Sequence, residues 1–274
     1  MAFRRHPVTG VPIVYAPERA ARPNAFGHWN DLGACPFCPG NESMTPPSIV
    51  EIGDPWRIRV FPNKYPAVDG HEVIVDSNRH DATFESLDNA AEVVAVYVDR
   101  VRAHAGAAYV SLFKNEGEMS GASLPHIHSQ VTPLPFVPPR VAREVAAFEA
   151  ASNCPLCGIR ENLIDENAAF VRFAPLGSSF PYEQWIVPKR HQQEFASLGS
   201  ADIEALAAIL QDAIRTTRTI AQSMNVLFVN FPSSRAAHYY IQLFPRLTSI
   251  AGFELATGVF IDIIDPAAAA RRLK

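Results

Sequence analysis

Two histidines, His126 and His128, stand two positions apart in residues 115–130, a stretch rich in small residues. On an extended strand, side chains at this spacing point to the same face. The glycines, serines and proline before them predict a loop that enters the strand and leaves room for a ligand against the backbone. The alternative is an amphipathic strand that carries two histidines by chance.

The chain has four cysteines, and they form two pairs, Cys35 with Cys38 and Cys154 with Cys157. Pairs with two intervening residues indicate metal knuckles or redox dithiols. A redox dithiol usually opens a helix in a strand–helix–strand unit, whereas turn-like residues flank the first pair here. We therefore favour a metal site.

An internal repeat indicates where the other ligands lie. After each cysteine pair come an apolar strand, an Arg-His pair, a helix, a second strand and a strand with a histidine. The spacing agrees in the two copies, because 46 positions separate His80 from His126 and 47 separate His191 from His238. The predicted strands are 72–76, 108–113 and 126–130 in the first copy and 184–188, 226–231 and 238–242 in the second. The predicted helices are 87–105 and 198–222, with a further helix at 142–151.

The repeat gives two equivalent Cys2His2 sets, namely Cys35, Cys38, His80 and His126, and Cys154, Cys157, His191 and His238. Two thiolates and two imidazoles in a closed set suit tetrahedral zinc with no open position. Iron in one of the sets is an alternative. A further alternative is that the histidines are surface residues and the cysteines small core fillers.

The two copies differ at one informative position, where His128 in the first is matched by Tyr240 in the second. If His126 and His238 bind metals, His128 is the histidine left over in the pattern. It lies on a strand that its metal-bound neighbour would anchor, and such an arrangement holds an imidazole rigidly for attack. We therefore predict that His128 carries the chemistry.

Composition and charge limit the function classes. The 274 residues are 48% hydrophobic and 19% charged, enough for a full core and for two domains or one double-sized domain. The net charge of −4 argues against a duplex nucleic-acid partner. No apolar stretch approaches the length of a membrane span, and no apolar signal core begins the chain, so we expect no membrane association and a cytoplasmic location.

The copies predict an α+β fold with two tandem units, residues 1–140 and 141–274, whose antiparallel sheets merge and carry helices on one face. The proline-rich stretch 133–139 is expected to connect them as a stiff linker.

These motifs resemble those of the galactose-1-phosphate uridylyltransferase family and its adenylyl-transferring branch, the ADP-sugar phosphorylases, within the histidine-triad superfamily. The resemblance covers most of the chain. It rests on the opening strand and paired arginines at 4–23, the knuckle at 35–41, the nucleotide-binding strand at 61–67, the active-site loop at 115–130 and the sugar-binding segment at 251–254.

The resemblance implies exchange of a nucleoside monophosphate between a nucleoside diphosphate sugar and a sugar 1-phosphate or phosphate. A neutral imidazole is a good nucleophile near pH 7, so His128 would form a nucleotidyl-histidine. Gln130 stands where the superfamily's hydrolases commonly have a third histidine. A glutamine donates a hydrogen bond but carries no proton, which favours transfer over hydrolysis. Ser123, Asn115 and Gly117 would stabilise the phosphoryl oxygens.

The resemblance also implies the substrate-binding residues and a homodimer that lends the segment near Glu254 across its interface. Arg19 and Arg22 would assist with the phosphates. Phe37, Phe61, Asn63 and Tyr65 would line the base and ribose site, where an aromatic ring can stack on any base. Glu254 would hold sugar hydroxyls. The alternatives are solvated surface arginines, ordinary core packing of the aromatic rings and a plain surface carboxylate.

Some positions depart from the family pattern. Leu124 precedes the Pro-His pair where asparagine is usual, Ile127 replaces a proline between the histidines, and Lys64 replaces an aspartate. Thr248 and Phe260 stand where a lysine and a glutamine flank the sugar-binding glutamate. Galactose and uridine therefore stay open, and the Cys154–Cys157 pair resembles the adenylyl-transferring branch. A nucleotide hydrolase and a non-catalytic zinc module that binds nucleotides or a partner are the other two function classes.

Overall fold

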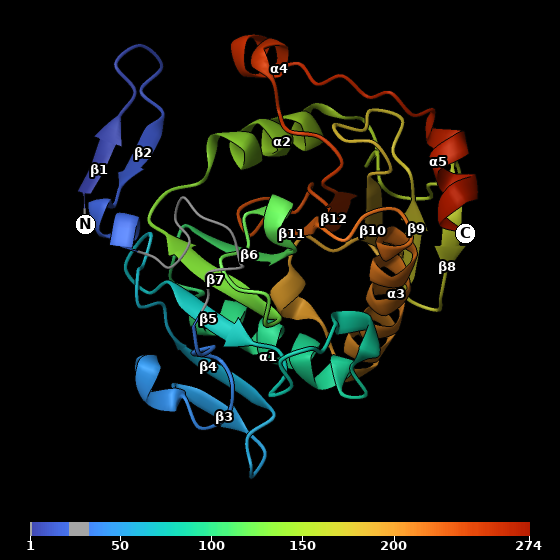
Figure 1. Ribbon diagram of the computed structural model, residues 1–274. Coiled ribbons are helices and arrows are strands. Elements are labelled where there is room, and N and C mark those ends of the chain that lie inside the picture. Colours follow the sequence, from blue (N-terminus) through green and yellow to red (C-terminus); the bar gives the residue numbers. More distant parts are fainter. Residues whose placement is uncertain (1, 22–32) are drawn as a thin grey trace.

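The computed structural model describes residues 2–21 and 33–274 (Figure 1). Its strands are β1 (Ala2–Arg5), β2 (Pro12–Tyr15), β3 (Val50–Ile52), β4 (Ile58–Pro62), β5 (Glu72–Val75), β6 (Tyr109–Glu116), β7 (His128–Leu134), β8 (Leu163–Glu166), β9 (Phe170–Phe173), β10 (Gln184–Pro188), β11 (Met224–Val229) and β12 (Tyr240–Pro245). Its α-helices are α1 (Ala90–Ala103), α2 (Pro139–Ala150), α3 (Ser200–Arg218), α4 (Gly252–Thr257) and α5 (Pro266–Leu273).

Strands β3 to β12 form one antiparallel ten-stranded sheet in the order β3-β4-β5-β7-β6-β11-β12-β10-β9-β8. Read outward from the β6–β11 pair at its centre, the two halves have the same strand sequence. The repeat in the amino-acid sequence is therefore also a repeat in topology. The predicted α+β fold of two merged units is confirmed, and β1 and β2 form a separate hairpin.

Helices α1 and α3 pack against each other and cover one face of the sheet (Figure 1). Their apolar residues pack in the main core against every second residue of the strands. Side chains return to the same face every 3.6 residues in a helix and every two residues in a strand. Helix α2 lies on the opposite face, where Arg140 contacts Tyr240 and Gln242 of β12. The sequence predicted that all helices would lie on one face of the sheet, whereas α2 lies on the other face.

Several predicted boundaries differ from those observed. The two long helices begin at Ala90 and Ser200, two to three residues after the predicted starts at 87 and 198, and each follows a separate 3₁₀ turn, Phe84–Ser86 or Phe195–Ser197. The first turn ends because the Ser86 hydroxyl accepts from the Thr83 amide and donates to its carbonyl. Strand β7 continues to Leu134 and α2 begins at Pro139, which shortens the predicted linker to 135–138. The predicted domain division at residues 140 and 141 falls inside α2 and stays a prediction.

None of the helices in the described ranges is long and apolar enough to cross a bilayer.

A buried polar network lies beneath the strand that carries His128. The Lys114 ammonium donates to Asp76 Oδ2 over 2.7 Å, and the Ser129 hydroxyl donates to the same oxygen over 3.1 Å. The Tyr97 hydroxyl of α1 hydrogen-bonds with Ser129 over 2.6 Å. Burial lowers the pKa of Lys114, but Asp76 and Glu116 outweigh it and hold that pKa above its ordinary value. The network therefore ties α1, β6, β7 and the residue that follows β5 together.

Replacing Lys114 with methionine should lower the free energy of unfolding by about 3–5 kcal/mol, because the Asp76 charge would stay buried without its cation. The matched control is Lys189→Met, which removes an ammonium from a solvent-exposed pair with Glu166. That change should barely alter stability, because water screens exposed ion pairs. Urea unfolding of both variants measures the difference, and equal effects would contradict the network.

Candidate active site

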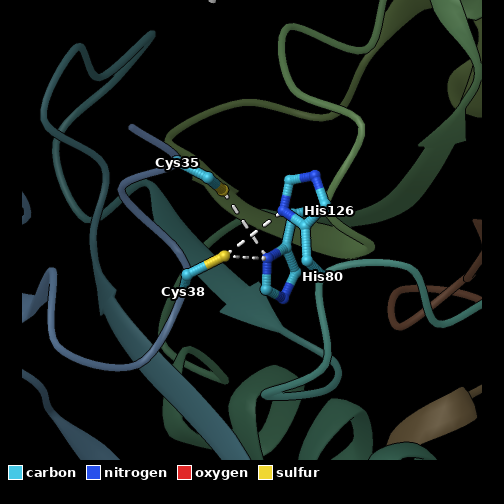
Figure 2. A group of neighbouring side chains, drawn as sticks. All are labelled: Cys35, Cys38, His80 and His126. Atoms are coloured by element: carbon cyan, nitrogen blue, oxygen red, sulfur yellow. Dashed lines mark hydrogen bonds between the residues drawn. The ribbon is translucent and has the colours of Figure 1, made fainter. Parts of the chain in front are cut away.

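The first predicted ligand set converges at one point, although its members come from three separate segments (Figure 2). The ligand atoms of Cys35, Cys38, His80 and His126 lie within 4.8 Å of one another. Cys38 Sγ lies 3.2 Å from His80 Nδ1 and 3.6 Å from His126 Nδ1, and Cys35 Sγ lies 3.6 Å from that same Nδ1. Sulfur and nitrogen ligands of one tetrahedral zinc ion would be about 3.6 Å apart, given ordinary zinc–ligand bond lengths.

Hydrogen bonding sets the form of the His126 ring. Its Nε2–H donates to the Ser77 carbonyl over 2.7 Å, so the lone pair of the neutral ring is on Nδ1, which faces the two sulfurs. Burial lowers the pKa of His126, which favours the neutral ring that a metal requires. The donor set and its orientation fit a closed structural metal site.

The second set, Cys154, Cys157, His191 and His238, has the same arrangement. Cys157 Sγ lies 3.4 Å from His191 Nδ1 and 3.6 Å from His238 Nδ1, and Cys154 Sγ lies 3.5 Å from His238 Nδ1. The His191 Nε2–H donates to the Arg235 carbonyl over 2.9 Å. Burial lowers the pKa of His238 to about 4. Both predicted Cys2His2 groups therefore exist and could bind metal ions.

His128 is the first residue of β7, and it lies two positions after His126, the last member of the first Cys2His2 group. It is buried, and its Nδ1–H donates to the His126 carbonyl over 2.8 Å. This bond places the lone pair of the neutral ring on Nε2. The Phe37 ring packs edge-on against His128 at a centroid distance of 5.3 Å and against His126 at 6.2 Å. His126 itself precedes β7, so the two histidines do not share a strand, and they line two different cavities.

A pocket of about 320 Å³ opens beside His128. Its volume lies in the range of small-molecule sites. Seven residues that the sequence singled out line it: Phe37, Phe61, Asn63, Tyr65, Ser123, His128 and Gln130. The rings of Phe37 and Phe61 lie 5.6 Å apart at a tilt of 59°, and they form its apolar wall with Val73 and Leu124. The pocket combines aromatic surface with polar groups that converge near His128.

Other predicted residues lie elsewhere. Arg19 donates to the Tyr65 carbonyl over 2.7 Å, which places it beside the pocket, whereas Arg22 lies outside the described residues. Glu254 is on α4, which stands apart from β7 (Figure 1), and its carboxylate accepts from the Ala251 amide of its own helix. In this chain Glu254 is therefore not part of the pocket. Asn115 lines a second cavity, of about 490 Å³, next to His126.

Gly117 lines that second cavity too, and packing explains its presence. Its φ of 81° and ψ of 158° fall in a region that only glycine adopts readily. A Cβ at this position would lie 2.6 Å from Ser223 Cα and 2.8 Å from the Gln222 carbonyl oxygen. The glycine therefore lets the active-site loop pack against residues 222–223. A role in stabilising phosphoryl oxygens stays a prediction for Asn115 and Gly117.

At the equivalent place in the second half, an arginine contacts the residues of β12. Trp185 pairs with Gln242 as Val73 pairs with Gln130. Arg140 of α2 donates to Tyr240 Oη over 2.9 Å and to Gln242 Oε1 over 2.7 Å. A guanidinium thus covers the residues equivalent to His128 and Gln130. The second copy therefore lacks a histidine at this position, although a cavity of about 770 Å³ lies beside Arg140, Tyr240 and Gln242.

The sequence analysis did not single out His71 or Arg140. His71 Nε2 lies 3.0 Å from Gln130 Oε1, although 59 positions separate the two residues. No periodic signal links such a pair, because the contact depends on the pairing of β5 with β7. The repeat indicates only the partners of Arg140, because Tyr240 and Gln242 occupy the positions that His128 and Gln130 have in the first copy.

A family model described as "Domain of unknown function (DUF4921)" matches residues 91–274. The ADP-glucose phosphorylase of Arabidopsis thaliana is 28% identical over 317 residues, which cover 96% of this chain and 90% of that protein. The galactose-1-phosphate uridylyltransferase of Thermotoga maritima is 24% identical over 323 residues, which cover 100% and 98%.

Solved structures agree with these likenesses. The ADP-glucose phosphorylase of Arabidopsis thaliana with bound ADP-glucose superposes with a TM-score of 0.82 at 28% identity, over 99% of this chain and 98% of that one. A uridylyltransferase structure superposes with a TM-score of 0.84 at 26% identity, over 100% and 97%. The resemblance to the galactose-1-phosphate uridylyltransferase branch of the histidine-triad superfamily is thereby confirmed.

Gly117→Ala should lower the free energy of unfolding by about 3 kcal/mol, because it adds a backbone clash to an unfavourable φ. Gly121→Ala is the matched control. Gly121 has a similar φ of 83° but nothing within 4 Å of an added Cβ, so its cost should be about 1 kcal/mol. Thermal unfolding of the two variants compares them, and equal losses would show that the contact with Ser223 is unimportant.

Proposed function

This chain belongs to the DUF4921 family, and we propose that it moves a nucleoside monophosphate from a nucleoside diphosphate sugar to a phosphate acceptor through a nucleotidyl-His128. One observation carries the proposal. A buried imidazole, His128, lies at the wall of an aromatic pocket, and its Nδ1–H donates to the carbonyl of His126, a member of the first Cys2His2 group. The names of the similar proteins, a phosphorylase and uridylyltransferases, point to the same chemistry.

The proposed reaction has two displacements at phosphorus. The His128 Nε2 lone pair attacks the α-phosphorus, an N–P bond forms, and the P–O bond to the sugar 1-phosphate breaks. An oxygen of the second phosphate then attacks, and the N–P bond breaks as a new P–O bond forms. The His126 carbonyl accepts the Nδ1–H throughout, which stabilises the positive charge that the ring gains in the adduct.

The pocket supplies the remaining contacts. Phe37 and Phe61 offer faces and edges against a base, and Asn63 and Tyr65, which line the same pocket, would contact the ribose. Ser123 and Gln130 border His128 and can donate to phosphoryl oxygens. Arg19 lies beside Tyr65 and would assist with the phosphates.

An ADP-sugar phosphorylase that uses inorganic phosphate is a second candidate, favoured by the make-up of the pocket. Within the described residues, no carboxylate lines the pocket beside His128, whereas Lys64 does. An inorganic phosphate acceptor needs cationic and hydrogen-bonding groups and no sugar-binding carboxylate. The likeness to an ADP-glucose phosphorylase favours the same alternative.

We further propose that both Cys2His2 groups bind zinc, which would fix the knuckles and the loops that precede β7 and β12. A closed four-ligand set leaves zinc no position for substrate, so its contribution is structural. Thiolate ligands need a reducing compartment, in keeping with a cytoplasmic protein. A homodimer would bring the exposed apolar side chains of α4, Phe253 and Leu255, and the nearby Glu254 against a second copy.

His128→Asn should abolish the covalent intermediate. With an α-³²P-labelled nucleoside diphosphate sugar and no acceptor, the wild-type chain should retain label on His128 and release it to added phosphate or sugar 1-phosphate. A panel of UDP-, ADP- and GDP-sugars identifies the base. His104→Asn, a histidine outside the pocket, is the control and should label normally. Immediate loss of label to water would indicate a hydrolase, and no labelling with any donor would indicate a binding protein.

Cys35→Ser or His126→Asn should remove one of two zinc ions and lower the Tm by about 10 °C or more, because a structural metal contributes its binding energy to folding. Cys154→Ser should do the same at the second group. His128→Asn, two residues from a ligand, should keep its full zinc content. Metal analysis and thermal unfolding measure both effects, and a metal-free variant that melts normally would exclude a structural role.

A further inference from the structure

A buried histidine, His71, lies against Gln130, which lines the pocket beside His128. It directly precedes β5, and its side chain is almost fully enclosed. His71 Nε2 lies 3.0 Å from Gln130 Oε1 and 3.2 Å from Asn63 Nδ2. Gln130 and Asn63 both line the pocket beside His128. His71 therefore stands behind two pocket residues without lining the pocket itself.

The backbone fixes which nitrogen of His71 carries the proton. The Ala67 amide donates to His71 Nδ1 over 3.0 Å, and a peptide N–H can only donate. Nδ1 must therefore present its lone pair, and the proton of the neutral ring is on Nε2. That Nε2–H donates to Gln130 Oε1. The amide oxygen of Gln130 is thus engaged away from the nucleophile, and its NH₂ group is the end left to meet a ligand.

Neighbouring contacts hold His71 in place. Its carbonyl accepts from the Asn63 amide over 2.8 Å, and its own amide donates to the Val68 carbonyl over 3.2 Å. The next residue, Glu72, accepts two hydrogen bonds from Arg100 of α1, of 2.7 and 2.8 Å. The backbone of His71 is therefore fixed by its own hydrogen bonds, and the next residue is fixed by an ion pair on the helix side of the sheet.

We propose that His71 is a positioning residue that sets the orientation of the Gln130 amide and thereby protects the nucleotidyl-histidine from water. This inference rests on the proposed function. With its NH₂ toward the phosphoryl oxygens, Gln130 stabilises the charge of the transferred group. With its oxygen there instead, it would repel those oxygens and accept a proton from a water molecule, which would orient that water for attack.

The test follows the fate of the labelled adduct. Wild-type chain is loaded with an α-³²P-labelled donor, and the share of label that goes to water is compared with the share transferred to added phosphate. His71→Phe keeps the volume and removes both ring hydrogen bonds. It should raise the ratio of hydrolysis to transfer about tenfold, as the loss of one hydrogen bond predicts. His71→Gln can accept from Ala67 and donate to Gln130, so it should restore the ratio.

His104→Phe is the matched control, because His104 contacts Glu72 over 2.9 Å on the helix side and no pocket residue. Its ratio should equal that of the wild type. An unchanged ratio in a His71→Phe chain that still forms the adduct would overturn the inference and leave the proposed function standing. If the wild-type chain forms no adduct with any donor, the proposed function fails and this inference fails with it.

A second measurement needs no variant. The ¹⁵N shifts of the His71 ring in the folded wild-type chain should show an unprotonated Nδ1 and a protonated Nε2 at neutral pH. A ring with its proton on Nδ1 would overturn the inference, whatever the stability of the variants.

Discussion

One residue, His126, connects the first Cys2His2 group to His128, the proposed nucleophile. Its ring presents Nδ1 to the two thiols, while its carbonyl accepts the Nδ1–H of His128. Because the ring and the carbonyl belong to the same residue, any shift of the metal group changes the orientation of the His128 imidazole. The Ser77 carbonyl holds the other side of the His126 ring. Few degrees of freedom remain for the nucleophile, which suits chemistry that requires an aligned attack.

The repeat shows which parts of this arrangement belong to the scaffold. Both halves keep the Cys2His2 group, the strand order and the long helix. They differ on the pocket face, where the cavity of the first half is lined by His128 and that of the second half by Tyr240, which is hydrogen-bonded to Arg140. They also differ behind it, since Lys114 and Asp76 form a buried ion pair under β7. The Cys2His2 groups are therefore shared by both halves of the fold, whereas a histidine at the position of His128 is found in the first half alone.

The sequence was most informative where chemistry depends on spacing along the chain. Cysteine pairs, Arg-His pairs and a His-x-His segment repeat at fixed separations, so both ligand sets and His128 could be predicted. Contacts that depend on strand register could not, and His71 beside Gln130 is the main example. Gly117 was assigned to phosphate binding because glycine is typical of phosphate loops, but its backbone conformation and the proximity of Ser223 already require a glycine there. The sugar-binding role of Glu254 was predicted by resemblance alone. Nothing in the sequence indicates that α4, which carries Glu254, stands apart from β7 of the same chain.

The proposed ping-pong transfer at a single imidazole would place a constraint on specificity. The leaving phosphate and the accepting phosphate must occupy the same side of the adduct in turn, because only one face of the phosphorus is open opposite Nε2. The polar groups near His128, Ser123 and Gln130 among them, therefore meet both phosphates alike. Contacts that act equally on donor and acceptor cannot distinguish them, so discrimination must come from groups farther out.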